Sequence, residues 1–379
     1  MFHMFPNGRT GPRTPIPHGA DPGFWPGFSR FSEKGLCRPV KLWYNTPSET
    51  LRGGVPVETV AGDGNWKLTF RREPDHIVLL RAVTCDSRAV LPGELLGLPV
   101  TVLGDHALAP NAAPVPGEEL WVTCGHQGSW DNRALEDLTL PSCLEEVGDY
   151  ALYGCREMHT LRLHDRVERW GGGCLMNCRA LRAVFLTRVG KTHGEALAFL
   201  CDELHEELDV TVYETDGGVT RLVFPDYVEA YEENCPAHHF DYTIYGGGHA
   251  YHHVFRDRQL SLRDYDGLWG KYLGEEHEPE TALRLAWLRL RWPSGLSLEA
   301  EERYWQYLKG RPREALLWQL SQKDIPGLRL LLDGLQPGPE LLGAACEQAR
   351  RARDTEALAL LLERRHQTEP GGFGKRFEL

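Results

Sequence analysis

The stretch LTLPSCLEEVGDYALYGCREMHT (138–160) is followed at once by LRLHDRVERWGGGCLMNCRALRA (161–183), and both stretches of 23 residues follow one pattern. The matching positions are Leu138 and Leu161, Leu140 and Leu163, Gly148 and Gly171, Cys155 and Cys178, and Met158 and Leu181. The alternating leucines predict a short strand at the start of each copy, and the shared glycine predicts a tight turn. A unit of this length cannot bury its own apolar face, so the copies must stack on one another.

Partial copies lie on both sides of this pair. A third strand is predicted at 184–186, again 23 residues further on. Residues 77–108 repeat the strand, the Leu-Pro step and the Gly-Asp-x-Ala-Leu turn, with five extra residues between Pro92 and Gly104. The later stretch 219–237 opens with a similar strand and proline, and it is either a decayed copy or a capping element. These copies predict a short solenoid whose strands form a parallel ladder.

The motif LPSCLEEVGDYALYGC (140–155) resembles the BspA-like bacterial leucine-rich repeat, whose usual form is IP-x-x-[VI]-x-x-IG-x-x-AF-x-x-C. Residues 77–108 are similar to the opening repeat of that family, with its G-x-P-V insertion at 97–100. The chain departs from the family pattern at Leu108, Leu152 and Leu175, which stand for Phe, and at Trp170. The resemblance covers about residues 77–187. It implies a leucine-rich-repeat binding scaffold and does not name what is bound.

From Pro279 onward the sequence changes to apolar-striped helices separated by turn residues. The predicted helices are ETALRLAWLRLRW (280–292), LEAEERYWQYLKG (298–310), REALLWQLSQ (313–322), IPGLRLLLDG (325–334), ELLGAACEQARRA (340–352) and TEALALLLERR (355–365). Residues 324–365 are similar to the helix pairs of ankyrin-like repeats, but the TPLH opening of a regular unit is absent. A generic α-helical repeat is therefore predicted.

The predicted fold class is α+β in several parts: a short leucine-rich-repeat solenoid, then a β-containing region, then a C-terminal α-helical repeat. The predicted parts are a disordered Pro/Gly-rich tail (1–29), a β-rich N-terminal cap with the solenoid (30–190), an acidic β-containing region (191–274), an α-helical, ankyrin-like repeat (275–366) and a second disordered tail (367–379). No apolar run is long enough to span a bilayer, and no signal-peptide core is found, so a cytoplasmic protein is expected.

Charge is concentrated in one segment of the chain. Between Leu200 and Asp241 twelve Asp or Glu residues stand against one Arg, a net charge of −11 out of −12 for the whole chain. This balance excludes clustered phosphate-binding cations, so we expect neither nucleic acid nor a membrane as a partner. The segment is interpreted as a solvated acidic face or as the contact for a partner with a basic surface. The ten cysteines form no CxxC motif, and buried reduced thiols are expected.

The most chemically suggestive residues are five histidines, His238, His239, His249, His252 and His253. They are candidate metal ligands, but their spacing fits no common metal motif, and a Gly turn between strands is expected at 245–255. The stretch VGKT (189–192) lacks the first glycine of a phosphate-binding loop, since Phe185 stands there. No GxSxG or HExxH motif is found. We expect no enzyme, no cofactor and no metal.

The leading hypothesis is a non-catalytic protein–protein interaction scaffold or adaptor, because two repeat types are found without a catalytic set. One alternative is an exported, surface-binding protein of the adhesin type, and another is a metal-dependent enzyme that uses the His238–His253 cluster. Candidate partner-binding residues lie between the leucines of the strand ladder (Thr139, Thr160, Arg162) or among tryptophans in less periodic stretches (Trp43, Trp121, Trp130).

Overall fold

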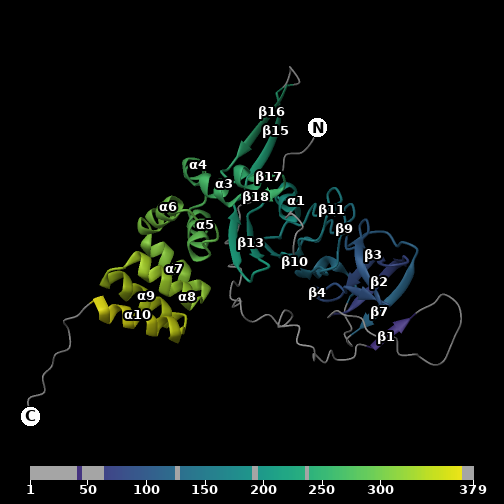
Figure 1. Ribbon diagram of the computed structural model, residues 1–379, viewed down its shortest axis with the longest axis horizontal. Helices are drawn as coiled ribbons and strands as arrows, with labels where there is room; N and C mark the ends of the chain where they lie inside the picture. The colour runs from purple at the N-terminus through teal and green to yellow at the C-terminus, as the bar shows by residue number, and fades with distance from the viewer. Residues whose placement is uncertain (1–40, 45–63, 124–128, 190–194, 235–238, 369–379) are drawn as a thin grey trace, which may run out of the picture. The chain divides into compact units, whose positions relative to one another are not determined.

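The computed structural model describes residues 41–44, 64–123, 129–189, 195–234 and 239–368 (Figure 1). The predicted tail 1–29 lies outside these residues, and so does most of the predicted tail 367–379. The described chain forms two compact units, one ending at Tyr304 and the other beginning at Trp305. None of the described helices is both long and apolar enough to cross a bilayer.

Five parallel strands form one side of a solenoid that occupies residues 77–213 in about five turns. In ladder order they are β4 (Arg88–Val90), β8 (Asp137–Thr139), β10 (Thr160–His164), β12 (Ala183–Thr187) and β13 (Leu208–Tyr213). Equivalent apolar residues are partners in register, as Leu138, Leu161 and Val184 are, and all three are buried. The predicted parallel solenoid is confirmed, whereas its leucine-rich type stays a prediction.

A second sheet closes the other side of the solenoid and extends it at its N-terminal end. Its strands, in order, are β1 (Lys41–Tyr44), β7 (Glu118–Thr123), β2 (Trp66–Arg72), β3 (Ile77–Thr84), β6 (Leu98–Leu103), β9 (Glu146–Val147) and β11 (Arg169–Trp170). The pairings from β3 to β11 are parallel, and those among β1, β7, β2 and β3 are antiparallel. The longer stretch between Pro92 and Gly104 in the first copy contains β5 (Glu94–Leu95), which pairs antiparallel with β6.

The structure explains why a cysteine recurs at the same position of each copy. Cys155 donates its thiol hydrogen to the carbonyl oxygen of Leu108, and Cys178 donates in the same way to Leu152, one turn back in each case. Burial raises the pKa of both thiols, that of Cys178 to about 12. The seven cysteines recorded in the described residues are free thiols, in agreement with the expectation of reduced, packed cysteines.

The repeated glycine is required for a reason other than the one predicted. Gly148 and Gly171 have no left-handed backbone, unlike a glycine that makes a tight turn. Instead each lies against the backbone of the preceding turn: a Cβ on Gly148 would lie 2.7 Å from the backbone nitrogen of Asp105. A Cβ on Gly171 would overlap the backbone of Gly148 and Asp149. The glycines therefore allow successive turns to approach closely.

The ladder continues past residue 190, the boundary expected from the sequence, because β13 adds to it in parallel. Strand β14 (Val219–Phe224) then pairs with β13 antiparallel, which identifies the stretch after 219 as an end of the ladder and not a further copy. Helix α1 (Glu195–Glu203) lies before β13, and its Phe199 stacks on Trp170 with ring centroids 4.9 Å apart. Trp170 thus packs against the helix that follows the last full repeat.

A hairpin and several short elements follow the ladder (Figure 1). They are β15 (Val228–Asn234), β16 (His239–Tyr245), α2 (His249–His252), β17 (Phe255–Arg256), β18 (Gln259–Leu260), α3 (Leu262–Gly267) and α4 (Trp269–Gly274). The expectation of strands on both sides of the glycines is wrong for 249–252, which are helical. Gly246 has a φ of 90°, and Gly248 packs directly on the carbonyl oxygens of Pro225 and Asp226, so the glycines allow a strand to pass into a helix here.

The predicted C-terminal helices are confirmed. They are α5 (Pro279–Arg291), α6 (Leu298–Lys309), α7 (Pro312–Gln322), α8 (Ile325–Leu335), α9 (Pro339–Arg351) and α10 (Thr355–Thr368). Four of them, α5, α7, α8 and α9, have a proline in the first turn, where its fixed φ and missing N–H cost nothing. The second unit contains α7 to α10, and Arg364 of α10 forms an ion pair with Asp333 of α8. Ankyrin-like identity stays a prediction.

Candidate binding surfaces

The three ladder residues predicted to bind a partner lie together on the outer side of β8 and β10. Thr139 and Arg162 are partners in register, and Thr160 precedes Arg162 by one alternation on the same face. Arg162 is fixed by its neighbours, with Nη1 2.5 Å from Oδ1 of Asp137 and the guanidinium 4.8 Å from the ring centre of Phe185. All are half-buried. Arg162 therefore has a structural role on this face, and a binding role stays a prediction.

The three predicted tryptophans come from distant parts of the sequence to one end of the second sheet. Trp43 of β1 is the register partner of Trp121 in β7. The ring of Trp121 contacts that of Trp130 edge to face, with centroids 5.5 Å apart, and the Lys67 ammonium lies 5.0 Å from its centre. Trp121 and Trp130 are half-buried, so only part of each ring is open to a partner, and a binding role stays a prediction. The side chain of Trp43 lies outside the described part.

Exposed side chains from equivalent turns of three successive copies, His106, Tyr150, Tyr153 and Met176, form a group that we call the turn surface. His106, Tyr150 and Gly173 hold the same position in successive copies, and each has a left-handed backbone with φ of 54°, 54° and 63°. The rings of His106 and Tyr150 stack with centroids 5.2 Å apart. Tyr150, Tyr153 and Met176 are 40%, 39% and 53% exposed, which is unusual for side chains of this size.

A cavity of about 790 Å³ adjoins the turn surface. It is lined by Leu80, Arg81, Asp105, His106, Ala109, Pro110, Asn111, Ala112, Ala113, Val115, Arg133, Tyr153, Gly154, Arg156, Glu157 and Asn177. Arg81 supports its wall by donating from Nη1 to the carbonyl oxygens of His106 and Ala109, at 2.8 and 2.7 Å. The cavity therefore joins apolar, aromatic and cationic groups, the mixture typical of recognition sites.

Sequence reasoning missed this site, although the repeat alignment held a signal for part of it. The position after Gly-Asp in the turn is His106 in one copy and Tyr150 in the next. A large ring at a tight-turn position of a repeat cannot enter the core, so it must face outward. The alanine- and proline-rich wall at 109–115 had no such signal, because its place depends on Arg81, which lies about a full copy earlier.

The candidate metal ligands do not assemble into a metal site in the described part of the chain, where no group of three His, Cys, Asp or Glu side chains is suitably placed. His249 and His253 stack with centroids 4.1 Å apart, and His253 Nδ1 contacts the carbonyl oxygen of His249 at 2.8 Å. The ring nitrogens of His252 lie 2.9 Å from the carbonyl oxygens of Cys201 and Pro225. His238 lies outside the described residues, as does the side chain of His239.

The buried His252 should make the stability of the fold sensitive to acid. Burial lowers its pKa to about 4 from the ordinary 6.5, against the opposing effect of the two carbonyl oxygens. As the pH falls, His252 therefore takes up its proton at a higher pH in the unfolded chain than in the folded one. The stability present above pH 6.5 is thus lost as the pH falls toward 4. We expect a loss of roughly 2–3 kcal/mol over this window, measured by urea unfolding at each pH. His252→Gln should flatten most of this slope, while His249 and His164, whose pKa values are also lowered by burial, retain a smaller part. An unchanged slope would contradict the assignment.

The acidic segment is not simply a solvated face, because three of its carboxylates form ion pairs within the chain. Arg284 of α5 forms ion pairs with Glu207 and Asp209, and these side chains are only 13% and 9% exposed. Arg188 likewise pairs with Glu214 at 3.0 Å. The basic partners come from up to 77 residues away in sequence, so composition alone could not identify them. Four further carboxylates of the segment, Glu229, Glu232, Glu233 and Asp241, belong to the β15–β16 hairpin.

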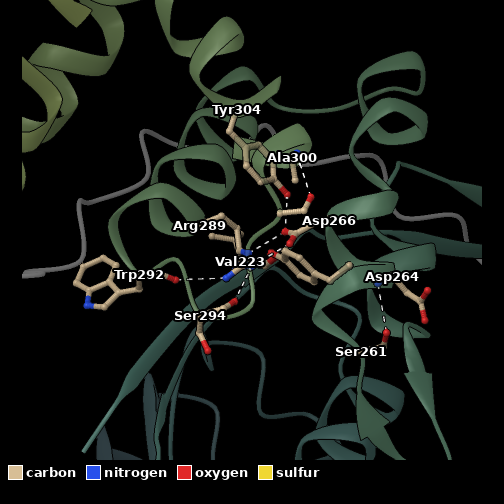
Figure 2. Close-up of polar contacts among 11 residues, drawn as sticks. Val223, Ser261, Asp264, Asp266, Arg289, Trp292, Ser294, Ala300 and Tyr304 are labelled. Carbon is tan, nitrogen blue, oxygen red and sulfur yellow. Dashed lines mark hydrogen bonds and ion pairs between the residues drawn. The ribbon is translucent and has the colours of Figure 1, made fainter. Parts of the chain in front are cut away.

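A buried polar cluster links α3, α5 and α6 (Figure 2). Arg289 donates to both carboxylate oxygens of Asp266, each at 2.8 Å, and the hydroxyl of Tyr304 donates to Asp266 at 2.9 Å. Arg289 also donates to the carbonyl oxygens of Trp292 and Ser294. Because the Arg289 side chain is 0% exposed and the carboxylate 5%, this cluster is structural and not a site for a ligand.

In comparisons with known proteins, no family model, no curated protein and no solved structure matches the chain.

Proposed function

We propose that this chain is a non-catalytic protein–protein interaction scaffold that binds an extended segment of a partner at the turn surface and its cavity. The observation that carries the proposal is the alignment of Tyr150, Tyr153 and Met176, all substantially exposed, beside a cavity of about 790 Å³. Exposed aromatic and methionine side chains that form one patch are enriched at protein interfaces.

The extent of the patch favours a polypeptide over a small molecule. The cavity reaches Asn177 of the third copy, and Met176 beside it continues the exposed surface. A small ligand would fill the cavity and leave the remaining rings exposed, whereas an extended segment would cover both. Solenoids offer such continuous surfaces because each repeat adds an equivalent position.

The lining of the cavity supports binding and not turnover. Its lining contains no Ser, Thr or Cys, so the Ser–His or Cys–His pair of many acyl-transfer enzymes is not formed there. Resemblance to BspA-like leucine-rich repeats and to ankyrin-like helix pairs agrees with a scaffold, and we retain both as proposals.

Site-specific photo-crosslinking tests this function. A photoreactive phenylalanine analogue at Tyr153, in the intact chain in a lysate of its source cells, should give a discrete protein adduct that mass spectrometry identifies. The matched control carries the analogue at Glu168, which is also exposed on the solenoid but lies outside the cavity lining. Adducts of the same proteins from both positions, or an adduct of a small molecule alone, would reject the scaffold proposal.

A further inference from the structure

The hairpin of β15 and β16 exposes large side chains on both of its faces. Tyr231 and Tyr242 are register partners on one face, 70% and 48% exposed, with ring centroids 4.9 Å apart. Val228 and Tyr245 are register partners on the other face, 60% and 49% exposed. In the described part of the chain these two strands form a sheet by themselves. Both faces of the hairpin are therefore open to solvent at these four side chains.

This arrangement is unusual for a strand pair that is complete in itself. An isolated two-stranded hairpin is marginally stable in water, and a third strand or a covering layer normally supports it. Within the described residues, each of the two strands also has an outer edge that pairs with no other strand. Such an edge is a template for one more strand.

The charge of the hairpin decides which occupant suits it. Residues 226–245 contain five acidic residues and no Lys or Arg. The acidic residues are Asp226, Glu229, Glu232, Glu233 and Asp241. Pairing with the hairpin of a second copy would bring two like-charged segments together, which is costly. A segment rich in Lys or Arg is favoured instead.

One of these acidic residues, Glu229, lies beside the two exposed tyrosines. It lies two residues before Tyr231 and so on the same face as Tyr231 and Tyr242. The hydroxyl of Tyr242 hydrogen-bonds to Glu229, and this bond raises the pKa of Tyr242 to about 12. A carboxylate held beside two open aromatic rings can receive a cationic side chain, by an ion pair with the acid and a cation–π contact with the rings.

We propose that the β15–β16 hairpin is a docking arm that takes an extended, Lys/Arg-rich segment of a partner protein as an added strand. Alternate basic side chains of that strand lie over Tyr231 and Tyr242 and meet Glu229. This proposal goes beyond the proposed function, because it assigns a second surface on another element and does not depend on the turn surface.

A short synthetic peptide in which Arg alternates with Val is the probe, and its binding to the full chain is measured by fluorescence anisotropy. We expect saturable binding that weakens as salt rises from about 50 to about 300 mM, and no binding of the matching Glu-Val peptide. Tyr231→Ala combined with Tyr242→Ala should weaken binding about tenfold or more. Bound peptide should also slow amide hydrogen exchange within 228–234 and 239–245.

The control is Tyr150→Ala, which removes an equally exposed tyrosine from the turn surface and should leave peptide binding unchanged. Because the hairpin tyrosines are exposed, circular dichroism should show that the double variant stays folded. Equal binding by the double variant, exchange slowed elsewhere but not in the hairpin, or a dimer formed through the hairpin in sedimentation would overturn the proposal. Loss of binding with Tyr150→Ala would place the peptide on the turn surface, and the docking arm would then be rejected while the scaffold proposal stands.

Discussion

Replacing Asp266 with alanine is expected to lower the free energy of unfolding by about 3–5 kcal/mol. The carboxylate receives three hydrogen bonds, two from Arg289 and one from Tyr304, and the change leaves the guanidinium buried without its counter-charge (Figure 2). Burial opposes the charged form of Arg289, but Asp266 reverses this effect and raises its pKa above the ordinary value. An arginine that cannot lose its proton must then pull in water or move out of the core.

Two further variants separate this effect from a general loss of helix α3. Asp264 lies in the same helix and pairs with Arg256 at the surface, so Asp264→Ala should cost far less stability than Asp266→Ala. Replacing Asp266 and Arg289 together by Leu and Met should recover much of the stability, because no unpaired charge remains. The measurement is urea unfolding of the full chain followed by circular dichroism. A cost for Asp266→Ala no greater than that for Asp264→Ala would contradict the prediction.

Gly171→Ala is expected to destabilise the solenoid by about 4 kcal/mol, more than most substitutions by a single methyl group. The added Cβ would overlap backbone atoms of Gly148 and Asp149 in the preceding turn. Backbone cannot rotate away as the end of a side chain can, so the two turns would have to separate. Separation would also stretch the hydrogen bond from the Gly171 N–H to the carbonyl oxygen of Val147, which is 2.7 Å long.

Gly172 provides the matched control, because it is the next residue in the same turn and a Cβ there meets nothing within 4 Å. Gly172→Ala should change stability by less than about 1 kcal/mol. Thermal unfolding with hydrogen exchange of the strands β8, β10 and β12 measures both variants. Similar behaviour of the two variants would mean that successive turns do not pack as closely as the structure has them.

The repeat pattern determined the solenoid because its information is local. Each copy of 23 residues has alternating leucines, which become a strand, and a cysteine that reaches one turn back. Stacking then follows from the repetition itself, since identical units bury identical faces. The C-terminal helices were equally predictable from their apolar stripes and their initial prolines.

The candidate sites depended on contacts that no local pattern contains. Asp209 can be buried because it forms an ion pair with Arg284. The cavity wall at 109–115 depends on the hydrogen bond that Arg81 donates to the carbonyl oxygen of Ala109. The close approach of Gly248, just before α2, to the carbonyl oxygens of Pro225 and Asp226 is a further contact of this kind.

Sequence by itself thus determined the strands of the repeat, their parallel stacking and the C-terminal helices, because residue spacing sets the exposed and buried faces of an element. Tertiary structure decided which charges are buried, which rings stay exposed and why Gly171 is needed. Those properties belong to pairs of residues, as for Asp266 with Arg289, and they arise only when the fold brings the two partners together.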